Sequence, residues 1–271
     1  MSNVAVRTWL FFIISLLGTL PAHAELILSS APRDTKEKEE AIFKPIVELL
    51  GKVSGEKVVF RYGDNQLTYQ SEMRKGAYDI AFDGPAFAGW RITALNHMPL
   101  VKFPGNLSFV AFVKNDQDRL RDLKDLAGRR VCAFAPPNLA TLVVLAEFDN
   151  PSRQPLIIEV QSFQGAYKGV LEGKCAAGIM QAKLHQESDK DTNATRVLFK
   201  SKPLPNQAFT AGPRVTPDAR EKMTKALLSP EGAEATQKLR DVFKVPALLP
   251  AAPDEFQGLG RLLRDTYGFE H

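Results

Sequence analysis

Histidine, cysteine and tryptophan are scarce in this chain of 271 residues, with four, two and two copies. The histidines beyond the first 24 residues are His97, His185 and His271, which lie too far apart in sequence for a paired zinc motif. No Gly-x-Ser-x-Gly elbow occurs, and the segment from Gly169 to Cys175 resembles a phosphate loop but is one residue short. The sequence therefore predicts no metal site, no cofactor and no catalytic group. An enzymatic function stays an alternative, but no sequence motif supports it.

Clustered positive charge is also lacking. The chain has 35 Lys and Arg against 31 Asp and Glu, a net charge of +4, and the basic residues are spread along its length. Such a distribution is typical of a solvated surface, so we expect no nucleic-acid partner. With 44% hydrophobic and 24% charged residues, the chain has an ordinary globular composition for one large domain or two small ones.

Only one long apolar run is present, and it lies at the N-terminus. The run from Trp9 to Leu20 follows the single charge of Arg7 and precedes Pro21 and the pattern Ala22-His23-Ala24. This order is that of a secretory signal peptide, residues 1–24, cleaved after Ala24. The alternative, a membrane anchor, would need an apolar run of about 20 residues. Removal of Arg7 leaves a net charge of +3, one less than +4, on a soluble, periplasmic protein.

The two cysteines, Cys132 and Cys175, both lie in the exported part, each near the start of an expected strand. An even number of cysteines in an oxidising compartment is compatible with a disulfide that stabilises the fold. The alternative is a pair of small buried thiols, because free cysteine is often fully buried. The sequence leaves both possibilities open.

After residue 24 the hydrophobic pattern alternates between short strands and helices. The first series consists of strands LILSS, VVFRY and YDIAF, separated by helices over residues 35–55 and 65–75 and followed by one over 84–95. Pro45 lies near the middle of the first helix or marks its true start. This alternation is typical of parallel βαβ units with helices on both faces of a sheet.

A second series follows two consecutive extended segments, MPLVKF and NLSFVAFVKN. We expect strands VCAFA, LIIEVQSF, CAAGIM and ATRVLFKS in this part, with PLPNQAFTAG extended. The expected helices lie over residues 118–128, 139–148, 164–173, 217–228, 231–243 and 254–267.

Two α/β lobes joined by two extended segments explain this order. Residues 25–112 and 206–271 would form lobe one, and residues 113–205 an inserted lobe two, with hinges near residues 109–114 and 205–211. The cleft between two such lobes is the natural ligand site. This layout resembles the type 2 periplasmic binding proteins, with a mostly parallel sheet in each lobe.

Particular stretches resemble the phosphate/phosphite/phosphonate transporter substrate-binding family. They are KPIVELLGKVSGEKVVF, EMRKGAYDIAFDGPAFAGW, LKDLAGRRVCAFAPPNLATLVVL, FQGAYKGVLEGKCAAGIM and NQAF. The resemblance covers residues 25–243 and implies a receptor that binds a small oxyanion or a related polar molecule. It also implies delivery of that ligand to the membrane permease of an ABC transporter. We expect a monomer.

The resemblance places a ligand-binding hydroxyl cluster at the start of the helix after VCAFA. The matching residues here are Leu139, Ala140 and Thr141, so Thr141 alone retains a hydroxyl, with Asn138 as the expected N-cap. Elsewhere Phe163 stands where the family has histidine, and Ala176 where it has an acidic residue. These exchanges remove donors that a buried dianion needs.

Two more exchanges lie in lobe one. Asp83 stands where the family has an aromatic residue and Gln66 where it has tyrosine. Asp83 could instead cap the following helix, and Arg33 could be either a pocket cation or a surface charge. The predicted ligand-binding residues are Arg33, Gln66, Asp83, Asn138, Thr141, Phe163, Gln164 and Gln181. The alternative function is a periplasmic sensory module that presents its ligand-bound form to a membrane receptor or kinase.

Overall fold

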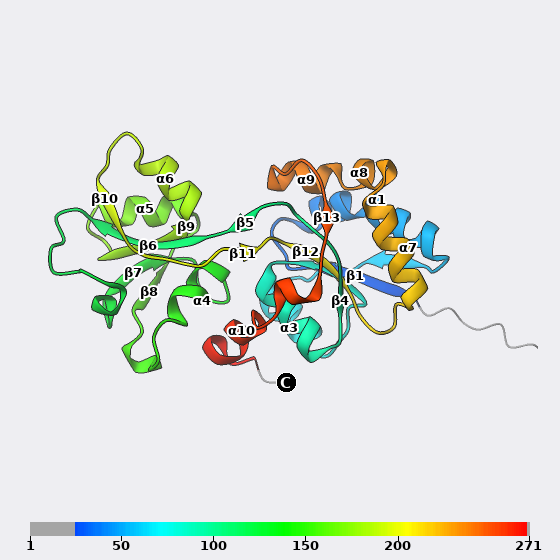
Figure 1. Ribbon diagram of the computed structural model, residues 1–271, viewed down its shortest axis with the longest axis horizontal. Helices are drawn as coiled ribbons and strands as arrows, with labels where there is room; N and C mark the ends of the chain where they lie inside the picture. The colour runs from blue at the N-terminus through cyan, green and yellow to red at the C-terminus, as the bar shows by residue number, and fades with distance from the viewer. Residues whose placement is uncertain (1–24, 270–271) are drawn as a thin grey trace, which may run out of the picture.

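The computed structural model describes residues 25–269. The predicted signal peptide, residues 1–24, and the cleavage after Ala24 lie outside these residues. Two lobes lie side by side along the long axis, each built on its own β-sheet, and the chain crosses between them in both directions (Figure 1). The predicted two-lobed α/β fold is confirmed.

The first lobe contains a sheet in the order β13-β4-β12-β3-β1-β2. β1 pairs in parallel with β2 and β3, whereas β12 is antiparallel to both β3 and β4. β4 therefore runs in the same direction as β1, β2 and β3, so most strands of this sheet point one way. The strands are β1 (Leu26–Ser30), β2 (Val58–Phe60), β3 (Ile80–Asp83), β4 (Met98–Lys102), β12 (Ala208–Ala211) and β13 (Leu249–Pro250).

The sheet of the second lobe repeats this plan in the order β10-β6-β9-β7-β8. β7 is parallel to β8 and β9, and β6 is antiparallel to β9 and β10. Read from the other edge, β8-β7-β9-β6-β10 matches β2-β1-β3-β12-β4 of the first lobe. The strands are β6 (Phe109–Lys114), β7 (Arg130–Ala133), β8 (Leu156–Glu159), β9 (Ala177–Gln181) and β10 (Thr195–Lys200).

The two crossing segments pair with each other. β5 (Asn106–Leu107) is antiparallel to β11 (Leu204–Pro205) in a separate two-stranded sheet. β6 belongs wholly to the second sheet, so the sequence-based lobe boundary at residue 112 falls inside this strand. The crossing lies a few residues earlier, at β5.

Helices cover the sheets, and most lie where the hydrophobic pattern predicts them. α1 continues through Pro45, and its spacing of buried Phe43, Ile46 and Leu50 places one face on the first core. The helices are α1 (Lys36–Ser54), α2 (Gln66–Arg74), α3 (Pro85–Ala94), α4 (Leu139–Leu145), α5 (Phe163–Leu171), α6 (Ala182–Asp189), α7 (Pro217–Leu227), α8 (Pro230–Ala235), α9 (Gln237–Phe243) and α10 (Gly260–Tyr267).

The predicted helix over residues 118–128 is wrong. Only a 3₁₀ turn, η1 (Leu123–Leu126), forms there. The Asp125 carboxylate accepts from the N–H groups of Arg121 and Asp122, and Asp122 accepts from that of Lys124. Such local side-chain acceptors compete with helical hydrogen bonds.

The C-terminal helices are also more broken than predicted. The segment 231–243 divides at Thr236, whose hydroxyl donates to the Gly232 carbonyl at 2.7 Å. The last segment divides into the 3₁₀ turn η3 (Pro253–Phe256) and α10, with Gly258 between them at φ 78°. α6 was not predicted, because its sequence AKLHQESD has little apolar periodicity.

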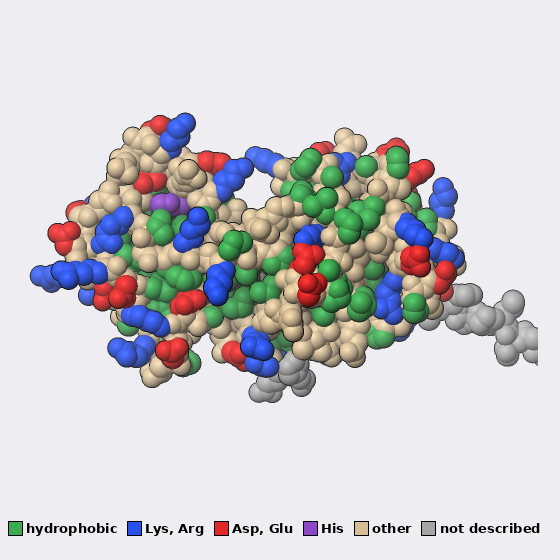
Figure 2. Space-filling model, viewed as in Figure 1, with side chains coloured by type: hydrophobic (Ala, Val, Ile, Leu, Met, Phe, Trp, Pro, Cys, Tyr) green, Lys and Arg blue, Asp and Glu red, His purple; other side chains and the backbone are tan. Residues whose placement is uncertain are grey.

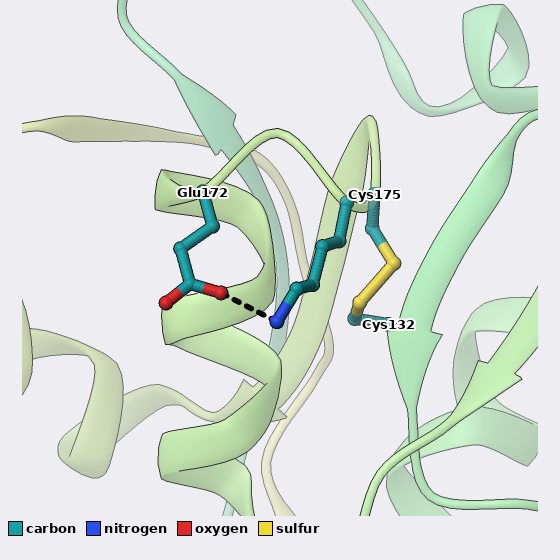
Figure 3. The surroundings of a disulfide bond; sticks show 4 residues. Cys132, Glu172 and Cys175 are labelled. Atoms are coloured by element: carbon teal, nitrogen blue, oxygen red, sulfur yellow. Dashed lines mark ion pairs between the residues drawn. A yellow bond between two sulfur atoms is a disulfide. The ribbon is translucent and has the colours of Figure 1, made fainter.

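The two cysteines form a disulfide that links β7 to the loop before β9 (Figure 3). Both cysteines are buried and share a small cluster with Ala166 of α5. Outside this cluster, Glu172 and Lys174 form an ion pair at 2.7 Å. Within residues 25–269, no helix combines the length and the apolarity needed to cross a membrane.

α10 connects the lobes at a second place. This helix follows the first-lobe elements in the chain and packs against α3, and it also contacts α4 of the second lobe (Figure 1). Leu263 of α10 is fully buried in a cluster that contains Trp90 of α3 and Leu142 of α4. The lobes therefore contact each other beside the crossing segments.

Candidate functional site

A cavity of about 540 Å³ lies between the two lobes. Residues at the carboxyl ends of strands from both sheets line it: Ala31 follows β1, Gly84 follows β3, Phe134 follows β7, and Glu159 ends β8. In open α/β sheets, ligands bind at this end of the strands. The cavity is therefore the candidate ligand site.

Two helices begin at the wall of this cavity. Gln66 and Leu67 belong to the first turn of α2, and Ala86 and Phe87 to the first turn of α3. First-turn N–H groups have no acceptor within their own helix, and the helix dipole gives this end a partial positive charge. The arrangement thus favours an anionic or strongly polar group in the cavity.

Arg33 lines the cavity, as predicted from its place after the first strand. Its Nη1 donates to the Ser30 hydroxyl at 2.5 Å and to the Ala31 carbonyl at 3.0 Å. The guanidinium also lies over the rings of Phe82 and Phe243, at 5.7 and 5.4 Å from their centroids. These contacts fix the direction of the side chain at the cavity wall.

Gln66 lines the cavity too, with an exposed side chain whose Nε2 donates to the Pro32 carbonyl at 3.0 Å. Asn138 lies on the opposite wall, where it is the N-cap of α4 and accepts from the Ala140 N–H at 3.1 Å. The structure therefore brings Arg33, Gln66 and Asn138 together around one cavity, from both lobes.

Asp83, which was predicted to contact the ligand, does not line the cavity. Its side chain is fully buried and pairs with the equally buried Arg91, with 2.6 Å between Oδ2 and Nη2. It also accepts hydrogen bonds from the Ala31 N–H and the Tyr69 hydroxyl. A carboxylate without solvent needs such partners, and Arg91 supplies the opposite charge from behind the cavity wall. Asp83 is not the cap of α3 either, because Gly84 holds that position.

Two members of this buried network, Tyr69 and Arg91, have raised pKa values. Burial, followed by the negative charge of Asp83, raises the pKa of Tyr69 well above its usual value, so the phenol stays protonated and donates. Burial disfavours the charged form of Arg91, but Asp83 and Tyr69 outweigh this effect and raise its pKa. Asp83 and Arg91 thus neutralise each other, and the cavity is spared an extra negative charge.

Thr141 does not face the cavity. It is fully buried, and its hydroxyl donates to the Phe134 carbonyl at 2.6 Å, which closes the turn before α4. The only hydroxyl that the chain keeps from the family's cluster therefore has a structural partner. Phe163 does not line the cavity either, but packs edge-on against Phe134, which does, with 4.9 Å between ring centroids.

The two remaining predicted residues lie elsewhere. Gln164 is exposed on α5, where its Oε1 accepts from Ser188 at 3.0 Å. Gln181 lines a second cavity of about 680 Å³ on the α6 side, together with Lys183, Lys200 and Lys244. An opening between α6 and α9, with Lys or Arg side chains at its rim, is visible in the space-filling view (Figure 2).

Four polar residues of the first cavity were not predicted: Gln70, Glu159, Gln207 and Tyr267. Gln70 follows Gln66 by one helical turn, and this i, i+4 spacing places both on one face of α2. Gln207 lines both cavities, so they adjoin at the crossing segment. Tyr267 ends α10, and no local pattern connects it with residues far earlier in the chain.

The charges at the first cavity balance. Among its lining residues, Arg33 is the cation and Glu159 the anion. In residues 25–269 no group of three or more His, Cys, Asp or Glu could hold a metal ion. The site can therefore bind a polar molecule through hydrogen bonds and helix N-termini.

Comparison with known proteins agrees with this geometry. The family described as "ABC transporter, phosphonate, periplasmic substrate-binding protein" matches residues 28–256. A curated relative, the phosphate-import protein PhnD of Mycolicibacterium smegmatis, is 22% identical over 223 residues, which are 73% of this chain and 69% of the relative. Nothing in these matches favours a sensory module.

Solved structures share the fold at low sequence identity. XAC2383 from Xanthomonas citri, bound to ATP, has a TM-score of 0.68 and 14% identity, covering 91% of this chain and 99% of its own. PhnD1 from Prochlorococcus marinus, in complex with methylphosphonate, has a TM-score of 0.62 and 13% identity, covering 90% and 99%. These likenesses place the two lobes in a known architecture.

Proposed function

Since the chain belongs to the family of periplasmic substrate-binding proteins of phosphonate ABC transporters, we propose that its inter-lobe cavity binds a small phosphorus oxyanion. The observation that carries this proposal is the cavity wall, where Arg33 and the first turns of α2 and α3 meet. Backbone N–H groups and a guanidinium are the donors that proteins use for phosphoryl oxygens.

The charges of the cavity wall restrict the net charge that a ligand can carry. The wall carries Arg33 and Glu159, and the buried Asp83–Arg91 pair behind it is neutral. A fully ionised dianion would meet one guanidinium and one opposing carboxylate, which is poor compensation for its desolvation. A monoanion or a zwitterion suits these charges better. Lobe closure would surround such a ligand, and the closed form would dock on the membrane permease.

The proposal also covers the export of the protein, its oligomeric state and the absence of catalysis. The mature protein would begin at Glu25 after cleavage behind Ala24 and act as a periplasmic monomer that returns its ligand unchanged. Mass spectrometry of the exported protein tests the cleavage site, and light scattering tests the monomer. An unchanged ³¹P spectrum of ligand recovered after long incubation tests the absence of catalysis.

A thermal-shift series on the mature protein tests the ligand class. Phosphate, phosphite, methylphosphonate and aminoethylphosphonate are compared with sulfonates, carboxylates and organic cations. A ligand at about 100 times its Kd adds roughly 2.7 kcal/mol, which raises the Tm by about 5–10 °C for a protein of this size. Stabilisation by a phosphorus oxyanion supports the proposal, provided that Arg33→Ala weakens it at least about tenfold. Stabilisation by a cation or a carboxylate alone refutes it.

A further inference from the structure

Gln70 has a buried amide at the cavity wall without a hydrogen-bond partner. The residue is 5% exposed and lines the first cavity, and its Nε2 finds no acceptor among residues 25–269. Gln66, one turn earlier on α2, is exposed, and its Nε2 donates to the Pro32 carbonyl. A buried amide left unpaired costs about 1–3 kcal/mol, and nearly all buried polar groups in native proteins are paired. Nε2 itself has almost no accessible surface, but Gln70 lines the cavity, so rotation of its side chain would let a molecule in the cavity become the partner of this amide.

The helix that carries Gln70 is held in place from behind. The adjacent Tyr69 is fully buried, and its hydroxyl donates to the Asp83 carboxylate. Arg91 donates to the Tyr69 hydroxyl at 3.3 Å and contacts the Met73 sulfur at 2.9 Å. These contacts fix two consecutive turns of α2 against α3. The backbone of Gln70 is therefore held rigidly beside the cavity, which reduces the entropy lost when a ligand binds there.

The amide differs from the charged groups and helix N-termini of the wall in its hydrogen-bonding capacity. Arg33 and the helix N-termini only donate, and the Glu159 carboxylate accepts when it is ionised. A glutamine amide does both, through Nε2–H and Oε1, within one side chain. A singly protonated phosphonate presents the matching pair, an ionised oxygen and a P–OH group on the same phosphorus. A sulfonate and a doubly ionised phosphonate present only acceptors.

We propose, on the basis of the proposed function, that Gln70 is a specificity-determining residue that selects the monoprotonated form of a phosphonate ligand. Nε2 donates to an ionised phosphonate oxygen, and Oε1 accepts from the P–OH group. The charged groups of the cavity agree with a monoanion: Arg33 and Glu159 line it together with Gln70, and the buried Asp83–Arg91 pair carries no net charge. A phosphoryl group loses its second proton near neutrality, at about pH 6 for a phosphorylated side chain. Affinity should therefore fall as the pH rises through the second pKa of the ligand.

The test uses calorimetry with methylphosphonate and methanesulfonate on the mature wild-type protein and on Gln70→Leu and Gln70→Glu. We expect Gln70→Leu to bind methylphosphonate at least tenfold more weakly below its second pKa, to lose less affinity for methanesulfonate, which can only accept from Nε2, and to lose the pH dependence. The ligand-free Tm of Gln70→Leu should be unchanged or higher, because an unpaired buried amide is removed. A residue with a purely structural role would instead lower the Tm.

Gln154→Leu is the matched control, since Gln154 lies outside the cavity and donates to the Leu145 carbonyl at 3.2 Å. This variant should keep wild-type affinity and have a lower Tm. Wild-type affinity of Gln70→Leu, or equal losses for both ligands, would overturn the assignment and leave the proposed function intact. If the wild type binds no phosphorus oxyanion at all, both the function and the assignment are refuted. Gln70→Glu serves as the second variant should Gln70→Leu not fold, because its carboxylate cannot donate to the ionised oxygen and repels the anion, so it should also bind methylphosphonate at least about tenfold more weakly.

Discussion

Loss of one member of the Asp83–Arg91 pair should strongly destabilise the first lobe. Both side chains are fully buried, and their charged atoms lie 2.6 Å apart. In Asp83→Asn the guanidinium keeps its charge without a counter-charge, and in Arg91→Met the carboxylate loses its cation. Removing one partner of a buried ion pair typically costs about 3–5 kcal/mol. For a protein of this size, that corresponds to a Tm lower by about 6–20 °C.

The double variant Asp83→Asn with Arg91→Met separates the pair from general damage to the core. It removes both charges and keeps an amide oxygen that can accept from the Ala31 N–H, which Asp83 now accepts at 3.1 Å. Replacing a whole buried pair is often close to neutral, so the double variant should be more stable than either single variant. Urea unfolding of the four proteins gives the coupling energy directly.

Two results would refute this reasoning. Additive losses in the double variant would show that the charges do not depend on each other. Single variants that lose less than about 1 kcal/mol would show that the interior around the pair is solvated, as at exposed ion pairs. A matched surface control is Lys225→Ala, which breaks an exposed pair with Glu221 and should change stability little.

Three further predictions concern stability. Burial, and then the positive charges of Arg91 and Arg220, lower the pKa of His97 to about 3. On acidification, His97 therefore binds a proton at a higher pH in the unfolded chain than in the folded protein. The free energy of unfolding falls below about pH 6.5 as a result, by up to about 1.4 kcal/mol per pH unit. Urea titrations from about pH 7 to about pH 5 should show a shallower loss for His97→Gln, and parallel curves would contradict this origin. Cys132 and Cys175 are 43 residues apart, so replacing both with serine should cost about 4 kcal/mol of unfolding free energy by loop entropy. Reduction of the wild type should cost a similar amount and leave the serine variant unchanged, and a reduced wild type of full stability would exclude the disulfide as the cause. Leu263→Ala should lower the free energy of unfolding by about 2–5 kcal/mol. If α10 stabilises both lobes, it should also increase the amide hydrogen exchange of α4, whereas an increase confined to α3 would argue against that coupling.

Much of the fold follows from local sequence signals. Short apolar runs define β1, β3, β6 and β7, and the spacing of Phe43, Ile46 and Leu50 defines α1. The signals fail where side chains compete with the backbone. The carboxylates of Asp122 and Asp125 replace a predicted helix by a 3₁₀ turn, and Thr236 divides another.

The candidate site was only partly predictable. Arg33, Gln66 and Asn138 follow or precede expected elements at the carboxyl ends of strands, and the structure places them around one cavity. The role of Asp83 could not be inferred, because its partner Arg91 is itself buried by the packing of α3. A carboxylate after a strand has the same sequence signature whether it faces a ligand or a buried guanidinium.

By itself the sequence determined the alternation of elements and the family. These properties depend on hydrophobic period, turn residues and motifs, which are local. Tertiary structure alone decided which polar groups meet. Gln70, Glu159 and Tyr267 come from α2, β8 and α10 and share one cavity, whereas Thr141 is turned into the protein. Burial and hydrogen-bond partners arise from contacts between distant segments, so only the folded chain assigns them.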